Sequence, residues 1–179
     1  MMKNILGFAG SNSSTSINVQ LLKNLMDRLP SDYITKHIDV LDYSLPFYGE
    51  DIEKEQGVPE NAEKFATEIA QNDALIITIN EHNGSLSAYF KNLIDWTSRY
   101  KHQFLAGKKI FLAAASPGQG GASASLKYAK TAFSIFGGEV VETLSFPSFY
   151  DNFKNGIVVN PELEKEITSK INTFAQQTS

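Results

Sequence analysis

The sequence contains no cysteine. This absence excludes a disulfide-bonded scaffold, a thiolate nucleophile, and a cysteine-bound metal or iron–sulfur centre. The sequence also lacks a run of about 18 apolar residues, which excludes a membrane-spanning helix. Residues 1–3 lead directly into an apolar stretch without the pattern of a signal peptide. We therefore expect a cytoplasmic protein that has no membrane partner.

Positive charge is neither abundant nor clustered. The 16 Lys and Arg residues are outnumbered by 20 Asp and Glu residues, for a net charge of -4, and they form no basic stripe. Proteins that bind nucleic acid concentrate cations on one face, so this class of function is disfavoured. The three histidines are scattered along the chain and form no metal-binding cluster. A small-molecule ligand is the better expectation.

The 179 residues, 42% of them hydrophobic, can form the core of one domain spanning residues 1–179. Short apolar runs typical of buried strands alternate with stretches of helical spacing. Strands are predicted at residues 4–9, 33–40, 74–79, 109–115 and 139–144, and helices at 17–29, 62–69, 86–100, 122–136 and 161–174. Residues 41–60 and 146–160 read as long irregular segments. The alternation predicts an α/β fold in which helices cover both faces of a five-stranded parallel sheet, a three-layer α/β/α sandwich with right-handed crossovers.

Three small polar loops each follow a predicted strand, at residues 10–16, 81–85 and 116–121. Ligands of open α/β sheets bind at the carboxyl ends of the strands. Because parallel strands end at the same edge, the three loops predict one shared site.

The first of these loops is rich in hydroxyl groups and runs into a predicted helix. Hydroxyls, free backbone N–H groups and the positive end of a helix dipole suit an anion. The loop has no Lys or Arg, and it matches neither the nucleoside triphosphatase loop nor the dinucleotide glycine loop. These features predict a terminal phosphate monoester as ligand. The alternative is that Ser14 or Thr15 simply caps the helix.

The other two loops suit a flat ring. Backbone groups of residues 81–85 lie where a heterocycle could bind, although Asn83-Gly84 can also be a bare tight turn. The lone His82 is more often a loop histidine than a catalyst. The glycines of residues 118–121 allow the backbone to approach a planar ring closely, or serve turn geometry only. They do not form a Rossmann fingerprint, because they come late in the chain.

Taken together, the motifs resemble the NAD(P)H-dependent FMN reductase family. They are Gly10-Ser11 with Ser16 and Asn18, then Glu81-His82-Asn83-Gly84-Ser85 running into Lys91-Asn92-Leu93-Ile94-Asp95-Trp96, then Ser116-Pro117-Gly118 with Gly120-Gly121. The resemblance implies a flavodoxin-like fold, bound FMN, NADPH or NADH as electron donor, and a homodimer or homotetramer. It also implies that FMN carries the chemistry, with no catalytic side chain and no metal. The implied cofactor-binding residues are Ser11, Ser13, Ser16, Ile17, Asn18, Glu81, His82, Asn83, Gly84, Ser85, Ser116, Pro117, Gly118, Gly120 and Gly121.

The chain departs from the family pattern at four positions. Ser13 stands where many members have an arginine, so weaker FMN binding is expected. Asn80 and His82 occupy positions often filled by proline and tyrosine, and Ala88 replaces a frequent proline. An imidazole beside the flavin in place of a phenol ring is expected to alter substrate preference.

The resemblance implies an oxidoreductase that passes electrons from NAD(P)H through FMN to a small acceptor. The acceptor could be a quinone, an azo or nitro compound, a metal ion or free flavin. Two alternatives stay open. One is a flavodoxin-type electron carrier that does not oxidise NAD(P)H, and the other is a non-enzymatic module that keeps the flavin-binding fold.

Trp96 lies off the inward stripe of the predicted helix at residues 86–100, together with Tyr100 and the later Leu105. Aromatic side chains outside the core stripe are enriched at interfaces. We therefore expect a second subunit to bury Trp96. The alternative is packing within the chain against residues 146–153.

Overall fold

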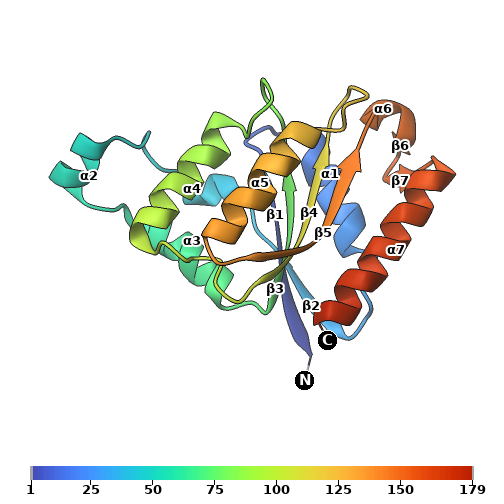
Figure 1. The fold of residues 1–179 in the computed structure, drawn as a ribbon, viewed down its shortest axis with the longest axis horizontal. Helices are drawn as coiled ribbons and strands as arrows, with labels where there is room; N and C mark the ends of the chain where they lie inside the picture. Colours follow the sequence, from blue (N-terminus) through green and yellow to red (C-terminus); the bar gives the residue numbers. More distant parts are fainter. Residues whose placement is uncertain (1, 179) are drawn as a thin grey trace.

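The computed structural model describes residues 2–178 and contains a parallel sheet of five strands in the order β2-β1-β3-β4-β5 (Figure 1). This is the strand order of flavodoxin-like folds, and it confirms the predicted α/β class. The central strands β3 and β4 are almost entirely buried, as expected of strands covered on both faces. The strands are β1 (Lys3–Gly10), β2 (Tyr33–His37), β3 (Ala74–Ile79), β4 (Lys109–Ala115) and β5 (Glu139–Phe146).

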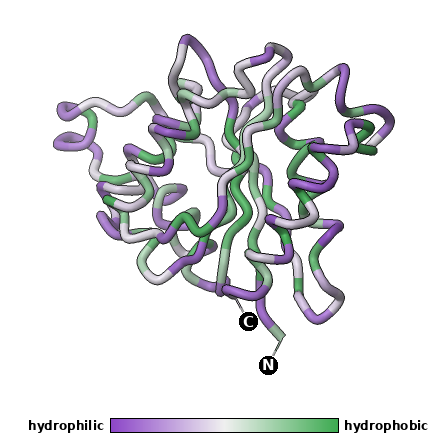
Figure 2. The backbone as a smooth tube through the Cα atoms, turned by 45° about the vertical axis from the view of Figure 1, so that its right-hand side comes forward, coloured by the Kyte–Doolittle hydropathy of each residue, from purple (hydrophilic) through white to green (hydrophobic). Residues whose placement is uncertain are grey.

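Helices cover both faces of this sheet, so the predicted three-layer sandwich is confirmed. The helices α3, α4 and α5 pack on one face and α1 and α7 on the other, each over its own hydrophobic cluster. Aromatic rings meet edge to face in both layers, as Phe8 does with Phe65 and Phe111 with Phe174. Figure 2 shows hydrophobic residues concentrated in the central strands and hydrophilic ones outside. The helices are α1 (Ile17–Met26), α3 (Glu60–Ala70), α4 (Ala88–Tyr100), α5 (Ser123–Ile135) and α7 (Pro161–Thr178). None of the helices within residues 2–178 is long and apolar enough to cross a bilayer.

Helix α4 starts two residues later than its hydrophobic pattern predicts. Ser87 is its N-cap, because the Ser87 Oγ accepts a hydrogen bond from the Phe90 N–H at 3.2 Å. The same hydroxyl donates to the Gly10 carbonyl at the end of β1, 3.1 Å away. The start of α4 is thus tied to the loop that follows the first strand.

The prediction that residues 41–60 form one irregular loop is wrong. The short 3-10 helix η1 (Val40–Tyr43) and the helix α2 (Glu50–Gln56) form within or beside this segment. We call residues 45–57 the arm; in Figure 1 its helix α2 projects from the body of the molecule. None of the residues of α2 is buried.

The arm overturns the prediction for Trp96. This side chain is fully buried within one chain, its Nε1 donates to the Pro46 carbonyl at 2.8 Å, and its ring meets that of Tyr48 at 5.1 Å. The expectation that a second subunit buries Trp96 was therefore wrong. The alternative, that Trp96 packs against residues 146–153, was also wrong. Leu105 is also buried, whereas Tyr100 stays partly exposed with its phenol donating to Glu63.

Residues 146–160 are more ordered than predicted. They contain a short helix, α6 (Phe149–Asn152), and an antiparallel hairpin of β6 (Phe153–Lys154) and β7 (Ile157–Val158). The rings of Phe149 and Phe153 stack at 4.7 Å. This packing places Tyr150, the residue after Phe149, beside the carboxyl edge of the sheet.

Candidate functional site

A cavity of about 330 Å³ lies where β1, β3 and β4 end, and parts of all three predicted loops line it. The structure thus brings together residues that are more than a hundred positions apart in the chain. The described lining residues are Ser11, Ser13, Thr15, Ser16, Ile17, Asn18, Asn80, Glu81, His82, Ala115, Ser116, Pro117 and Tyr150.

Two larger hollows lie away from the strand ends. One of about 670 Å³ borders α3 and one of about 500 Å³ borders α7, and charged side chains line much of both. If volume were the only criterion, these two hollows would be preferred as the ligand site. We assign the site to the smaller cavity because the carboxyl ends of parallel strands are where open α/β sheets bind ligands.

The first loop contributes four hydroxyl side chains to the cavity. Ser16 is also the N-cap of α1, since its Oγ accepts a hydrogen bond from the Val19 N–H at 3.4 Å. The cap is therefore not Ser14 or Thr15, the two residues that the capping alternative named. Ser14 is exposed and is not among the described lining residues. The first turn of α1 opens on the cavity through Ile17 and Asn18, which places the positive end of its dipole there.

Asn18 fastens this loop to the sheet. Its Oδ1 accepts from the Ala115 N–H at 2.8 Å and its Nδ2 donates to the Ala115 carbonyl at 3.2 Å. The Asn18 carbonyl accepts a further hydrogen bond from Thr78. The side chain is 1% exposed. Its amide oxygen is thus engaged with β4, which makes Asn18 a residue that positions the loop.

Glu81 connects the second loop to helix α5, which follows the third loop. Its Oε2 accepts a hydrogen bond from the Ser125 N–H at 2.9 Å, in the first turn of α5. The N-cap residue of α5 is Ala122, which has no side-chain acceptor to offer. A carboxylate at this helix end satisfies a free N–H and complements the dipole. The site residue predicted at this position therefore also supports the architecture of the cavity.

Residues 82–85 form the tight turn that was the alternative for this loop. Asn83 and Gly84 have φ values of 53° and 76°, and His82 and Ser85 exchange backbone hydrogen bonds of 2.9 and 3.1 Å. Both positive angles fit a two-residue hairpin turn, for which Asn-Gly is the preferred pair. Asn83, Gly84 and Ser85 are exposed and are not among the described lining residues, so they lie outside the cavity.

One part of the third loop lines the cavity, and the other part forms the turn that leads into α5. Ser116 and Pro117 line the cavity, whereas Gly118, Gly120 and Gly121 are not among its described lining residues. Gly121 has φ 56°, and a Cβ there would lie 2.1 Å from the Ser145 Oγ. The positive φ and the close approach of Ser145 explain why glycine occupies position 121.

Sequence reasoning missed four lining residues: Thr15, Asn80, Ala115 and Tyr150. Thr15 lies inside a loop already singled out, Ala115 is the last residue of a predicted strand, and Asn80 directly follows another predicted strand. Tyr150 had no local signal, because its place depends on how residues 146–160 fold.

The cavity contains a buried acceptor without a partner. Within residues 2–178 the Asn80 Oδ1 is buried and receives no hydrogen bond, while the Asn80 Nδ2 lies 3.4 Å from the His82 Nε2. An unsatisfied buried polar group costs about 1–3 kcal/mol, so an N–H donor that reaches this oxygen would be favoured here. The hydroxyls of the first loop and the N-terminus of α1 fit the phosphate of FMN.

These features define a flavodoxin-like flavin mononucleotide protein. The family described as NADPH-dependent FMN reductase matches residues 3–151, and the chain belongs to this family. It is therefore an FMN-dependent oxidoreductase with NAD(P)H as electron donor.

Similar proteins agree with this assignment. The chain is 34% identical over 117 residues to an NAD(P)H-dependent FMN reductase of Pseudomonas aeruginosa, covering 65% of this chain and 62% of that protein. It is 40% identical over 74 residues to a quinone reductase of Escherichia coli, covering 41% and 39%. Each match spans less than two thirds of the relative. The FerB flavoenzyme of Paracoccus denitrificans, an NAD(P)H:(acceptor) oxidoreductase, has the same fold, with a TM-score of 0.77 at 23% identity over 98% of this chain and 97% of that one.

Proposed function

We propose that the protein transfers electrons from NADPH or NADH through FMN to a small acceptor, with quinones as the first class to test. The observation that carries the proposal is the meeting of three strand-end loops at one cavity. The quinone reductase activity named for the Escherichia coli relative supports the choice of acceptor. Bound FMN would supply the two-electron chemistry, and the protein would orient it.

We assign the parts of the cofactor to the loops by their chemistry. Ser11, Ser13 and Ser16 would hold the phosphate at the start of α1, where hydroxyls and the helix dipole meet. His82, Ser116 and Pro117 would border the ring. The backbone of residues 83–85 and 118–121 would flank it from outside the cavity.

Identification of the cofactor is the first test. The first loop suits a terminal phosphate, so we expect the pigment released by heat to be FMN, measured by mass spectrometry. FAD alone would show that the loop is assigned wrongly. A protein that stays colourless after FMN is added would favour the non-enzymatic module.

Turnover is the second part of the same test. We expect the FMN-loaded protein to oxidise NADPH or NADH when benzoquinone is present, followed by the loss of absorbance of the reduced nucleotide without oxygen. A holoprotein that binds FMN but oxidises neither nucleotide would favour the flavodoxin-type electron carrier.

We further propose that the protein works in the cytoplasm as a homodimer or a dimer of dimers. The absence of cysteine does not identify a compartment by itself. A chain without disulfide bonds does, however, fold without an oxidising environment. Cell fractionation tests the location, and sedimentation measures the assembly.

A further inference from the structure

Reduction of a quinone requires a proton as well as electrons. When a quinone accepts a hydride, which carries two electrons, the product is a hydroquinone monoanion. One proton must then form an O–H bond to give the neutral hydroquinone. Ferricyanide, in contrast, accepts one electron and no proton. The following inference rests on the proposed function, and it concerns the source of this proton.

Among the described lining residues of the cavity, three have side chains that titrate as acids or bases: Glu81, His82 and Tyr150. The Glu81 carboxylate accepts the Ser125 N–H, and an ionised carboxylate has no proton to donate. Phenols are weak acids near neutral pH, whereas imidazole changes charge between pH 5 and 8. No Lys or Arg occurs among these lining residues. His82 is therefore the proton donor best suited to the cavity.

The surroundings of His82 allow a repeated proton cycle. The side chain is exposed, so the imidazole can regain a proton from solvent. Its backbone is held by two hydrogen bonds to Ser85, which place it at the start of a rigid turn. One side of the residue thus contacts water while the other lines the cavity.

Asn80 can form a hydrogen bond to the ring Nε2 whether or not this nitrogen carries a proton. The Asn80 Nδ2 lies 3.4 Å from the His82 Nε2 and can donate to it when the ring is neutral with its proton on Nδ1. The Asn80 Oδ1 has no partner within residues 2–178. A half-turn of the amide would exchange the two atoms, so that Oδ1 accepts the Nε2–H of a charged ring.

We propose that His82 donates the proton that completes reduction of a quinone-class acceptor, with Asn80 as the residue that positions the imidazole. The Nδ1–H bond of the imidazolium breaks as the O–H bond of the hydroquinone forms. The electron pair of the N–H bond stays on Nδ1, and the neutral ring keeps its proton on Nε2, where the Asn80 Oδ1 accepts it. Solvent then restores the proton.

Single-turnover kinetics with two acceptors tests the proposal. The FMN-loaded protein is reduced with dithionite and mixed with benzoquinone or ferricyanide, and the rate per bound FMN is measured from pH 5.5 to 8.5. For the wild type, the ratio of the quinone rate to the ferricyanide rate should fall as pH rises, because the imidazolium loses its proton. For His82→Gln, the ratio at the acid end should be at least about tenfold lower and nearly independent of pH.

Two further variants sharpen this experiment. His102→Gln is the matched control, because His102 is exposed and packs against Phe136 outside the cavity; it should retain the wild-type ratio. Asn80→Ala removes the oxygen that would accept from the charged ring. Its pH profile should therefore keep its shape but move to lower pH.

Nitrogen NMR of the three histidines provides a readout that does not depend on turnover. In the oxidised FMN-loaded protein, added hydroquinone should shift the His82 resonance, assigned by its loss in His82→Gln. The resonances of His37 and His102 should not move. A His82 signal that hydroquinone leaves unchanged would contradict contact between the imidazole and the acceptor.

The outcomes separate this inference from the proposed function. A His82→Gln variant that keeps the wild-type ratio and pH profile would overturn the inference and leave the function intact. If the dithionite-reduced protein shows the expected profile but neither NADPH nor NADH reduces it, the proposed donor is wrong and the role of His82 stands.

Discussion

Ser16 shows how one side chain of this site performs two tasks. Its hydroxyl caps α1 through the Val19 N–H, and the residue lines the cavity where we place the phosphate. A substitution that only removes the hydroxyl would disturb both the helix cap and the proposed phosphate contact. Aspartate separates them, because it is as good an N-cap as serine but brings a negative charge.

We expect Ser16→Asp to weaken FMN binding at least about tenfold, since it loses a hydrogen bond to a charged phosphate, worth about 1.5–3 kcal/mol, and adds repulsion. The melting temperature of the apoprotein should stay close to that of the wild type. Titration followed by quenching of flavin fluorescence measures the affinity, and calorimetry measures the melting.

Ser14→Asp is the matched control for this prediction. Ser14 belongs to the same loop, is exposed, and is not among the described lining residues. The added charge should therefore change FMN affinity much less than it does at Ser16. Equal affinities for the wild type and Ser16→Asp would mean that the loop caps its helix and does not hold a phosphate.

At the scale of elements, the arm depends on α4 for its position. The Asn92 Oδ1 accepts from the Tyr48 N–H at 2.7 Å, and the Asn92 Nδ2 donates to the Pro46 carbonyl at 2.9 Å. Arg99 pairs with Glu53 at 2.9 Å. This hydrogen bond from Arg99 lowers the pKa of the Glu53 carboxyl. Because α2 buries none of its own residues, such contacts hold it in place.

We expect Asn92→Ala to loosen the arm while the sheet stays folded. Each net hydrogen bond contributes about 0.5–1.5 kcal/mol, so the open population of the arm should rise about fivefold or more. Trypsin should then cut after Lys54 correspondingly faster, and amide exchange in α2 should rise without a similar change in β3.

Lys91→Ala provides the control on the same helix. Lys91 pairs with Asp95 at 2.6 Å, and no hydrogen bond of its side chain to the arm is recorded among residues 2–178. Cleavage after Lys54 should keep its wild-type rate. If Asn92→Ala also keeps that rate, the contacts of Trp96 and Arg99 suffice to hold the arm.

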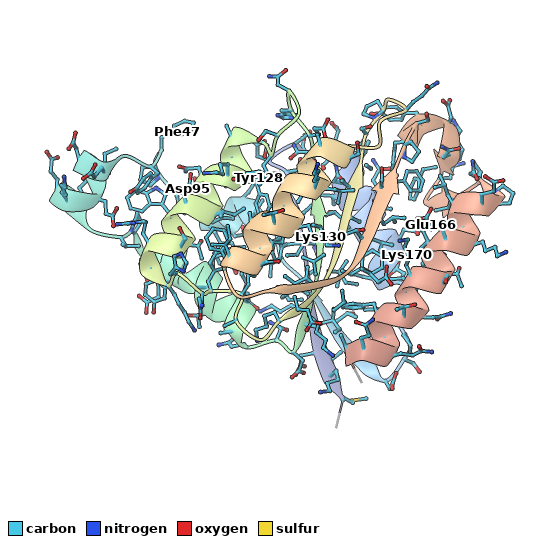
Figure 3. All side chains as sticks on the ribbon, in the orientation of Figure 1. Phe47, Asp95, Tyr128, Lys130, Glu166 and Lys170 are labelled. Carbon is cyan, nitrogen blue, oxygen red and sulfur yellow. The ribbon has the colours of Figure 1, made fainter. Side chains whose placement is uncertain are left out.

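At the scale of the whole molecule, the burial of Trp96 within one chain changes where a partner subunit should be sought. Phe47, on the arm side of the molecule in Figure 3, is 76% exposed. A large exposed aromatic side chain on a projecting segment is typical of an interaction surface. We therefore move the proposed subunit contact from Trp96 to the arm.

We expect sedimentation velocity at micromolar concentration to give a dimer or tetramer for the wild type and a smaller species for Phe47→Glu. Ile157→Glu is the control, because Ile157 is also well exposed, at 64%, but lies in the β6–β7 hairpin on the far side of the molecule (Figure 1). A wild type that sediments as a monomer would contradict the proposed assembly and leave the flavin site untouched.

Local patterns predicted all five strands of the sheet, although the strand predicted at residues 33–40 ends at His37 because Val40 begins η1. The strands at residues 74–79 and 109–115 were predicted with the bounds that the structure has, because continuous apolar runs of this length suit strands covered on both faces. The three polar loops were also recognisable, since parallel strands must end at one edge. Sequence patterns therefore sufficed for the fold class, and they named the loops at which we propose the site.

Only the tertiary structure decided which side chains face the cavity and which support it. Asn18 bonds to Ala115, 97 residues away, Glu81 to Ser125, 44 away, and Trp96 to Pro46, 50 away. Periodicity reports which face of an element is buried, but it carries no information on the loop that covers that face. A hydrogen bond between distant segments forms only when the packed sheet has fixed both ends, so these roles belong to the folded molecule.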